Sequence, residues 1–369
     1  MQTKTLKPKV RESSLELFRI ITMLIIVAHH YIVNSGISSQ MITMENATDW
    51  NSLFCLLFGW GGKTGINCFL LITGYFMCKS NITLKKFLKL LLPIVFYNVV
   101  IYFVFLLSGY STFSSQELLL AFIPLNGLGD NFFSTFLAFY LFIPFLNILI
   151  KGMNERQHLF LIGLCLLLFT VAQTFLKVAN GIRYIGWFMV IYFIASYFRL
   201  YTKEIFNKCA VWGLATIISL LFSWGSVIIG AYTFKTTGTA MQYFYVSDSN
   251  KILALVTAVC AFLFFKNLKM RYVPAINLIA ASAFGVLMIH ANSNTMRRWL
   301  WWDTLKNAQM FSSNKLILHA VISVLGVYIV CTVIDMFRIQ LLEKPFFKLY
   351  DKLDIENKVK NIFKPRKSA

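Results

Sequence analysis

The chain has 369 residues, of which 58% are hydrophobic and 14% are charged, and its mean hydropathy is +0.67. A soluble domain of this length cannot cover so much apolar surface, so the composition excludes a soluble globular protein and predicts a polytopic membrane protein. The net charge of +20 would suggest a nucleic-acid partner in a soluble protein, but here the basic residues lie between apolar segments. We therefore expect them to orient the chain in a lipid bilayer, with no nucleic acid as partner.

Apolar segments long enough to cross a bilayer follow one another along the chain. After a basic arm at residues 1–13, ten spans are predicted at about 14–33, 54–77, 87–108, 131–150, 157–176, 184–200, 210–232, 250–266, 276–293 and 316–337. Lysines and arginines concentrate in alternate connecting segments, which predicts an all-α protein with ten transmembrane helices and both termini in the cytoplasm. We expect one membrane domain over 14–337 and a basic cytoplasmic tail over 338–369, in which 341–353 has the pattern of an amphipathic interfacial helix.

Two local patterns limit the kinds of site to expect. Glycines 59, 61, 62 and 65 lie near the start of the second span and predict an irregular entry, which other parts of the protein must cover. The seven cysteines have no Cys-x-x-Cys spacing and mostly lie in apolar runs. The sequence therefore predicts neither a metal site nor a disulfide framework.

The first span carries ionisable residues near both of its ends. Arg19 and His30 are separated by ten residues, so at ~100° per residue they lie on one face of a helix, about 16 Å apart along its axis. Arginine suits phosphate or carboxylate, histidine can take a proton near neutral pH, and ionisable groups inside a membrane are candidate functional sites. A structural alternative is an arginine that extends to the interface and a histidine bonded between helices. His29 lies ~100° around the helix, so His30 alone shares the Arg19 face.

These motifs, and their order along the chain, resemble the membrane-bound acyltransferase-3 family. Arg19 and His30 match its Arg-x10-His signature, and Glu16 matches its acidic position. Lys86 and Lys89 stand where the family has the two arginines of an Arg-x-x-Arg connector. Further similar segments occur, in order, at 65–75, 139–147 and 283–290.

The resemblance implies a membrane O-acyltransferase. It would move an acyl group, most often acetyl from cytosolic acetyl-CoA, to a hydroxyl of a cell-envelope or exported polysaccharide, in a plasma membrane that is expected to be bacterial. Arg19, Lys86 and Lys89 would bind the phosphates of the acyl-CoA. His30 would be either the general base for the acceptor hydroxyl or a nucleophile that carries the acyl group. Glu16, one turn from Arg19, would fix the guanidinium and is the second candidate catalytic residue.

Three further residues are candidates for contact with the acceptor, a glycan or a lipid-linked sugar. His290 lies near the outer end of the ninth span, at about the depth of His30, and an interfacial hydrogen-bonded histidine is its structural alternative. Arg297 and Arg298 adjoin tryptophans 299, 301 and 302. Such a basic and aromatic cluster suits sugars, but it is also typical of a membrane-interface belt.

Two other classes of protein stay open at this point. A transporter or flippase of a lipid-linked sugar or another metabolite would use the intramembrane Arg and His as a substrate or proton site. Internal repeats and paired broken helices, which are common in transporters, are not evident in the sequence. A structural subunit of a glycan-assembly complex is the third class. The acceptor and the choice between acetyl and another acyl group also stay open.

Overall fold

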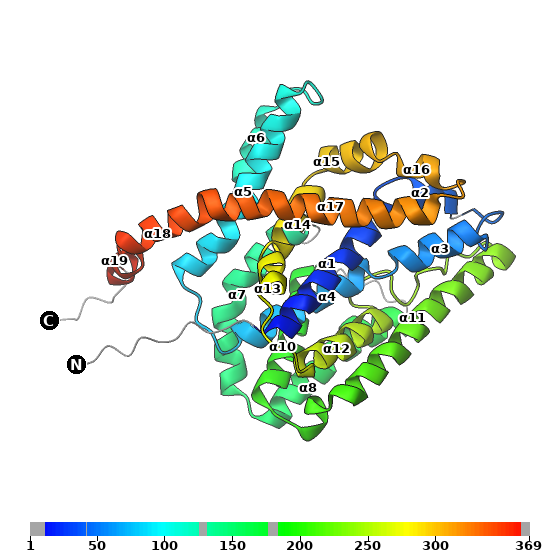
Figure 1. Cartoon of the computed structure of the whole chain (residues 1–369). Helices are drawn as coiled ribbons and strands as arrows, with labels where there is room; N and C mark the ends of the chain where they lie inside the picture. The colour runs from blue at the N-terminus through cyan, green and yellow to red at the C-terminus, as the bar shows by residue number, and fades with distance from the viewer. Residues whose placement is uncertain (1–11, 42, 125–130, 176–183, 363–369) are drawn as a thin grey trace.

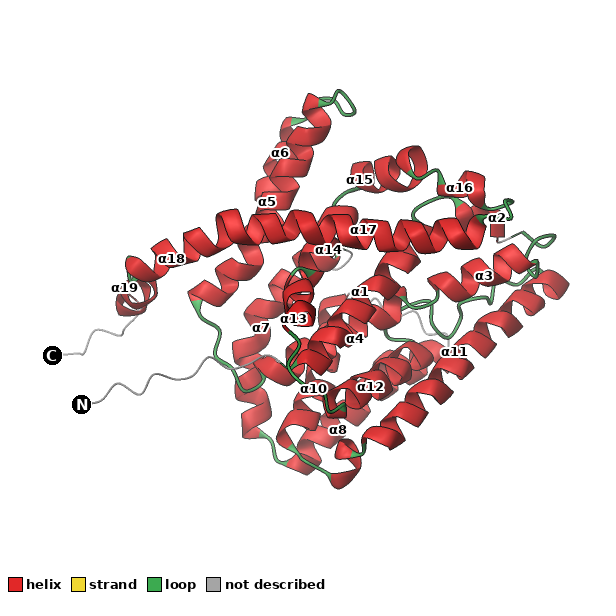
Figure 2. Ribbon diagram, in the orientation of Figure 1, coloured by secondary structure: helices red, strands yellow, loops and turns green. Residues whose placement is uncertain are grey.

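The structure, a computed structural model, describes residues 12–41, 43–124, 131–175 and 184–362. Within these ranges every regular element is a helix, as Figure 2 shows. Most of the predicted arm at 1–13, and the end of the predicted tail at 363–369, lie outside the described residues.

Among the described residues, seven helical segments are long and apolar enough to cross a membrane, or eight if one bent pair counts as a single span. The seven are α1 (Ser13–Val33), α3 with α4 (Trp50–Gly59, Gly62–Met77), α5 (Leu84–Leu107), α7 (Phe132–Gly152), α8 with η1 and α9 (Glu155–Leu166, Leu167–Val171, Ala172–Phe175), α11 (Cys209–Thr237), and α17 with η4 and α18 (Leu316–Arg338, Ile339–Glu343, Lys344–Lys352).

The shorter elements include the two apolar helices α10 (Tyr184–Leu200) and α12 (Ile252–Asn267). The others are α2 (Ile37–Met41), α6 (Ser115–Phe122), η2 (Glu204–Asn207), α13 (Pro274–Ala281), α14 (Ala283–His290), α15 (Asn294–Arg298), η3 (Trp299–Thr304), α16 (Asn307–Met310) and α19 (Ile355–Ile362). The chain is an all-α polytopic membrane protein, as predicted from its composition. The count of ten spans and the side of the termini stay predictions.

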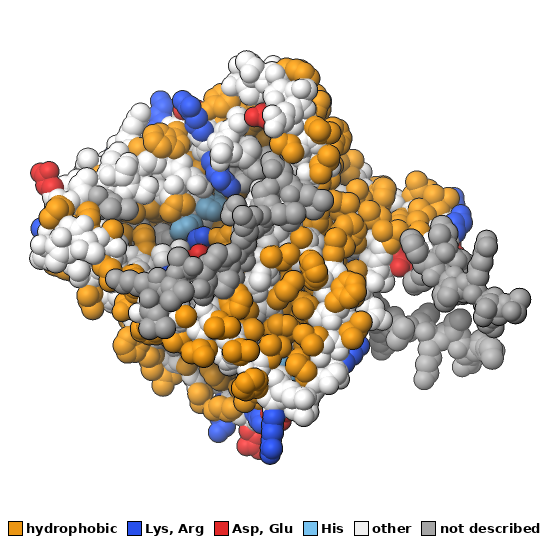
Figure 3. Space-filling model, turned by 180° about the vertical axis from the view of Figure 1, so that it is seen from behind, with side chains coloured by type: hydrophobic (Ala, Val, Ile, Leu, Met, Phe, Trp, Pro, Cys, Tyr) orange, Lys and Arg blue, Asp and Glu red, His pale blue; other side chains and the backbone are white. Residues whose placement is uncertain are grey.

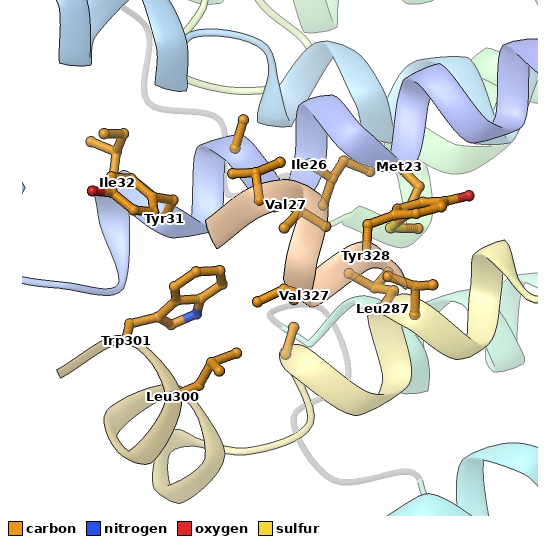
Figure 4. Packing of buried hydrophobic residues seen from close by; sticks show 14 of the residues in the cluster. Met23, Ile26, Val27, Tyr31, Ile32, Leu287, Leu300, Trp301, Val327 and Tyr328 are labelled. Carbon is orange, nitrogen blue, oxygen red and sulfur yellow. The ribbon is translucent and has the colours of Figure 1, made fainter. Parts of the chain in front are cut away.

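Helix α1 lies at the centre of the bundle. It packs against α3, α4, α12, α13, α14 and α17 (Figure 1). Met23, Val27 and Tyr31 of α1 are fully buried, and Figure 4 shows them in one cluster with Tyr328 of α17 and Trp301 of η3. Contacts with these six helices enclose α1 within the protein, so that most of its surface faces other helices and not lipid. The polar side chains of α1 are therefore held inside the protein.

The glycine-rich entry of the second span lets α4 approach α1 closely. The helix is interrupted between α3 and α4, where the sequence predicts an irregular entry, although the two helices form one long span. A Cβ on Gly62 would lie 2.2 Å from Cγ of His29, and one on Gly65 would lie 2.7 Å from Cγ1 of Ile26. Only a residue without a side chain fits at such distances, so these glycines set the depth at which α1 and α4 meet.

The late span formed by α13 and α14 is broken and then sharply bent. Pro274 starts α13 at a position where a missing N–H is tolerated, and Ser282 interrupts the helix. After His290, the last residue of α14, the chain turns by 93° into the α15–α16 segment. The Ser293 side chain caps α15 by accepting a hydrogen bond from the Met296 N–H at 3.1 Å. His290 therefore stands at the bend.

The last span continues directly into the tail. The stretch predicted as an interfacial helix, 341–353, is helical, and α18 docks against the start of α5. Lys85 pairs with Asp351 at 2.6 Å, and Lys89 lies over the ring of Phe347 at 5.2 Å. The predicted boundary between membrane domain and tail thus falls inside one continuous helical stretch.

Candidate active site

The imidazoles of His30 and His290 are in direct contact. Nδ1 of His30 lies 2.9 Å from Nε2 of His290, and the ring centroids are 5.1 Å apart. His290 is fully buried, and its Nδ1 lies 2.6 Å from the backbone oxygen of Val286. The central helix and the broken span are therefore joined at the depth of His30.

The carbonyl of Val286 fixes the direction of these hydrogen bonds when both rings are neutral. A carbonyl oxygen can only accept, so Nδ1 of His290 must donate to it. Nε2 of His290 is then an acceptor, and it receives the proton of His30 Nδ1. This leaves Nε2 of His30 with a free lone pair. The same logic orients catalytic histidines elsewhere, where a second group selects the tautomer that can accept a proton.

His30 lines a cavity of about 480 Å³ at the end of the bundle where α1 ends and α7 begins. His29 of α1, Lys63 of α4 and Arg297 of α15 line the same cavity, together with Tyr184. Figure 3 shows histidine side chains in a hollow of the surface, with Lys or Arg side chains beside them. The cavity is large enough for a small acyl group and part of an acceptor.

The cavity lining is cationic. Within the described part of the chain it contains Lys63 and Arg297 and no carboxylate. Lys63 pairs with Asp248, at 3.7 Å between Nζ and Oδ1, and donates to the Tyr184 hydroxyl. Arg297 donates to the Ala291 carbonyl at 3.2 Å and, at 3.3 Å, to Oδ1 of Asn294, which shares its helix. Both cations are thus held in place by neighbouring groups, and the cavity favours negative charge on whatever it binds.

His29 has a separate anchor. Its Nδ1 donates to the carbonyl of Gly59 at 2.6 Å, at the interruption between α3 and α4. His29 is rotated about the helix axis relative to His30, so its ring lies on the α4 side of the cavity, against Gly62. His29 therefore fixes α1 against α4, and His30 alone contacts His290.

The predicted donor-binding residues lie apart from this cavity. Arg19 and Glu16 form an ion pair of 3.9 Å near the start of α1, where Glu16 is buried. Nζ of Lys86 donates to the hydroxyl of Ser80, and Lys89 faces α18. The structure brings together His30, His290 and Arg297, and the roles of Arg19, Glu16, Lys86 and Lys89 stay predictions.

Arg298 does not line the His30 cavity. Its side chain is exposed, whereas that of its neighbour Arg297 lines the cavity. In the same region Asp303 accepts a hydrogen bond from the Tyr110 hydroxyl and so raises the pKa of Tyr110, while the positive charge of Arg298 acts in the opposite direction. Its predicted contact with an acceptor stays a prediction.

The sequence reasoning missed Lys63 and its partners Asp248 and Tyr184. No role in a site is assigned to Lys63 from the sequence. The available signal was a lysine within the second span itself, since an ionisable residue inside a span marks a candidate site. Asp248 and Tyr184 come from distant segments, so nothing in their local sequence indicates the contact.

The fold and the site define a class of protein: a polytopic helical membrane protein with a histidine pair beside a cationic cavity. The acyltransferase-3 family, described as an acyltransferase domain, matches residues 12–336. The chain belongs to this family and is a membrane acyltransferase. No curated protein and no solved structure matches the chain.

Proposed function

We propose that this membrane acyltransferase is an O-acetyltransferase of a plasma membrane. It would move acetyl from cytosolic acetyl-CoA to a hydroxyl of a cell-envelope or exported polysaccharide, or of its lipid-linked precursor. The observation that carries the proposal is the hydrogen bond between His30 and His290, because it leaves a lone pair on Nε2 of His30, a residue that lines the cationic cavity. Membership of the acyltransferase-3 family supplies the reaction class.

In the general-base route, Nε2 of His30 takes the proton of the acceptor hydroxyl as its oxygen attacks the thioester carbonyl. The C–S bond then breaks, and the proton held by His30 passes to the departing CoA thiolate. In the alternative route Nε2 attacks the thioester itself, the C–S bond breaks, and CoA leaves as its thiolate. The hydroxyl oxygen then attacks the acetyl-histidine, the C–N bond breaks, and the hydroxyl proton passes to the thiolate. Both routes need the same free lone pair on His30.

His290 acts in this scheme as a positioning residue. Both of its ring nitrogens are bonded, one to Val286 and one to His30, so neither is left to contact a substrate. We therefore replace the predicted substrate contact of His290 with the role of holding the tautomer and orientation of His30. Lys63 and Arg297 would stabilise the negative charge that develops on the carbonyl oxygen during attack.

The donor would enter from the opposite end of α1. Arg19, Lys86 and Lys89 are proposed to bind its phosphates, and the extended arm of CoA would run along α1 towards His30. Lysines give point charges without the planar fork of arginine, so Arg19 is expected to contribute most to this binding.

Radiolabelled acetyl-CoA supplied to membrane vesicles tests the proposal. Inside-out vesicles that contain the wild-type chain should transfer label from external acetyl-CoA to glycan, whereas vesicles with His30→Ala should not. His158→Ala is the matched control, because His158 is buried away from the cavity and bonds to the Phe193 carbonyl. Absence of label in glycan with the wild type, across extracts that supply several envelope glycans, would contradict the proposal.

The transporter that the sequence left open is not favoured, because the family match covers residues 12–336 and supplies acyl transfer as the reaction class. Transport sites typically combine two broken helices from related halves of the protein. Among the described residues there is one sharply bent pair, at the 93° bend after His290.

A further inference from the structure

A second cavity opens beside the His30 cavity at the same end of the bundle. It has a volume of about 390 Å³ and lies between α5, α6, the start of α7 and the bend that follows α14. The two cavities share Asn131, Phe133, Asn294 and Arg297 as lining residues. A ligand in the second cavity would therefore reach His30 past Arg297.

The described lining of this second cavity is mostly polar, and most of its polar side chains are uncharged. Asparagines come from four different segments: Asn98 from α5, Asn131 from the cap of α7, Asn292 from the bend and Asn294 from α15. Among the described residues, the charged members of the lining are Arg297 and an exposed glutamate of α6. Polar groups in an enclosed space need hydrogen-bond partners, and an amide both donates and accepts, as a sugar hydroxyl does.

Asn98 and Asn292 form the centre of this lining. Their side-chain amides are bonded to each other at 3.0 Å. Within the described residues neither amide has another partner, so one carbonyl and the remaining N–H groups stay available to a ligand. This holds whichever way the two amides are oriented. The pair thus presents donors and an acceptor side by side, which is the pattern that two neighbouring hydroxyls of a sugar ring require.

The outer wall of the cavity is held in place by α5 and α6. The hydroxyl of Tyr102 bonds to both the N–H and the carbonyl of Ser114, each at 3.0 Å, and so fixes the start of α6 against α5. Figure 1 shows this pair of helices projecting from the bundle. The cavity is therefore built between a projecting hairpin and the bend that carries Arg297.

We propose that the second cavity binds the acceptor as an uncharged sugar residue, with the Asn98–Asn292 pair holding adjacent hydroxyls while a further hydroxyl extends past Arg297 to His30. This inference rests on the proposed function and deepens it by assigning the acceptor a position and a chemical class.

Binding measured without acyl-CoA tests the inference separately from the reaction. Saturation-transfer NMR on the purified full chain in detergent would use the methyl glycosides of glucose, galactose, mannose and N-acetylglucosamine, with methyl glucuronide as the charged probe. We expect at least one neutral glycoside to bind. Asn98→Ala and Asn292→Ala should each weaken it roughly threefold to tenfold, as loss of a hydrogen bond does. Asn357→Ala, an exposed amide on α19, should leave binding unchanged.

A further variant, which blocks the cavity and keeps the asparagines, keeps the inference testable if an asparagine variant misfolds. Ser111→Phe places a large side chain in the cavity from the loop between α5 and α6 and keeps both asparagines, and it should abolish binding. The inference would be overturned if no neutral glycoside binds, or if the neutral glycosides bind all these variants equally. It would also be overturned if they bind more weakly than the glucuronide. Asparagine-dependent binding without acetyl transfer would uphold the cavity and overturn the proposed function. Acetyl transfer that is unchanged in Asn98→Ala, Asn292→Ala and Ser111→Phe would uphold the proposed function and overturn the inference about the cavity.

Discussion

Nδ1 of His30 lies 2.9 Å from Nε2 of His290, although 260 positions separate them in the chain. The contact joins the central helix to the end of a broken span, and the Val286 carbonyl behind it sets its direction. A base on the first helix is therefore oriented by a residue on a late one. Activity should therefore depend on the hydrogen bond between the two rings, and not only on a side chain at position 290 that fills the same space.

Substitutions at His290 separate these two requirements. His290→Gln keeps an atom that can accept the His30 proton, whereas His290→Phe fills the space without an acceptor. We expect the phenylalanine variant to lower kcat by ~10²-fold, within the usual range for general acid–base catalysis, with little change in KM for acetyl-CoA. The glutamine variant should recover part of the loss. Steady-state release of CoA thiol measures both, and equal activity of the two variants would contradict a positioning role.

Lys63 should contribute to the chemical step through its charge. Lys63→Gln removes a cation from the lining of the His30 cavity, and loss of one such group from a transition-state site typically lowers kcat ~10²-fold. Lys63→Arg should retain more activity than the glutamine variant. Lys235→Gln is the matched control, because Lys235 does not line the cavity and makes an exposed hydrogen bond to Thr48. A Lys63→Gln enzyme with wild-type kcat would exclude this role.

Gly62 should be intolerant of any side chain. A Cβ at this position would meet the His29 ring at 2.2 Å, so Gly62→Ala must push α4 away from α1. We expect a loss of about 1–3 kcal/mol in the free energy of unfolding, as in other overpacked sites. Gly163→Ala is a suitable control, since nothing lies within 4 Å of its added Cβ. Thermal unfolding in detergent compares the two, and equal midpoints would show that the helices are not in this close contact.

Substitution of Arg19 should weaken binding of the donor and leave binding of the acceptor unchanged. If its guanidinium holds a phosphate of acetyl-CoA, Arg19→Gln should raise KM for acetyl-CoA about tenfold, the cost of one hydrogen bond to a charged group. The affinity for a bound glycoside should stay the same. Isothermal titration with CoA itself provides the measurement. Unchanged CoA affinity would assign Arg19 a structural role with Glu16, its ion-pair partner.

The sequence was sufficient to predict an all-α polytopic membrane protein and to locate several of its long apolar helices. Apolar length sets a transmembrane helix directly, so the predicted segments coincide with α1, α5, α7 and α17 to within a few residues. The relation of Arg19 to His30 follows from helix geometry alone. The glycine cluster likewise predicted the interruption between α3 and α4, because glycine destabilises a regular helix.

The site itself was only partly predictable. The contacts His30–His290 and Lys63–Asp248 join segments far apart in the chain, and helix periodicity says nothing about which spans meet. The 93° bend after His290 was missed because the sequence around it reads as one apolar span followed by a polar loop. The sequence marks Asn98 as a polar residue in an apolar span and Asn292 and Asn294 as neighbours of His290, but it does not indicate that α5 meets the bend.

A double-mutant cycle on CoA thiol release tests the central claim, that His290 acts through His30, most directly. The wild type, His30→Ala, His290→Phe and the double variant would be compared at saturating acetyl-CoA, with equal folding checked by thermal unfolding. Because His290 has no role without His30, we expect the double variant to be no slower than His30→Ala. The losses of activation free energy in the two single variants would then be far from additive. Losses that multiply, or a His30→Ala enzyme as active as the wild type, would contradict the claim.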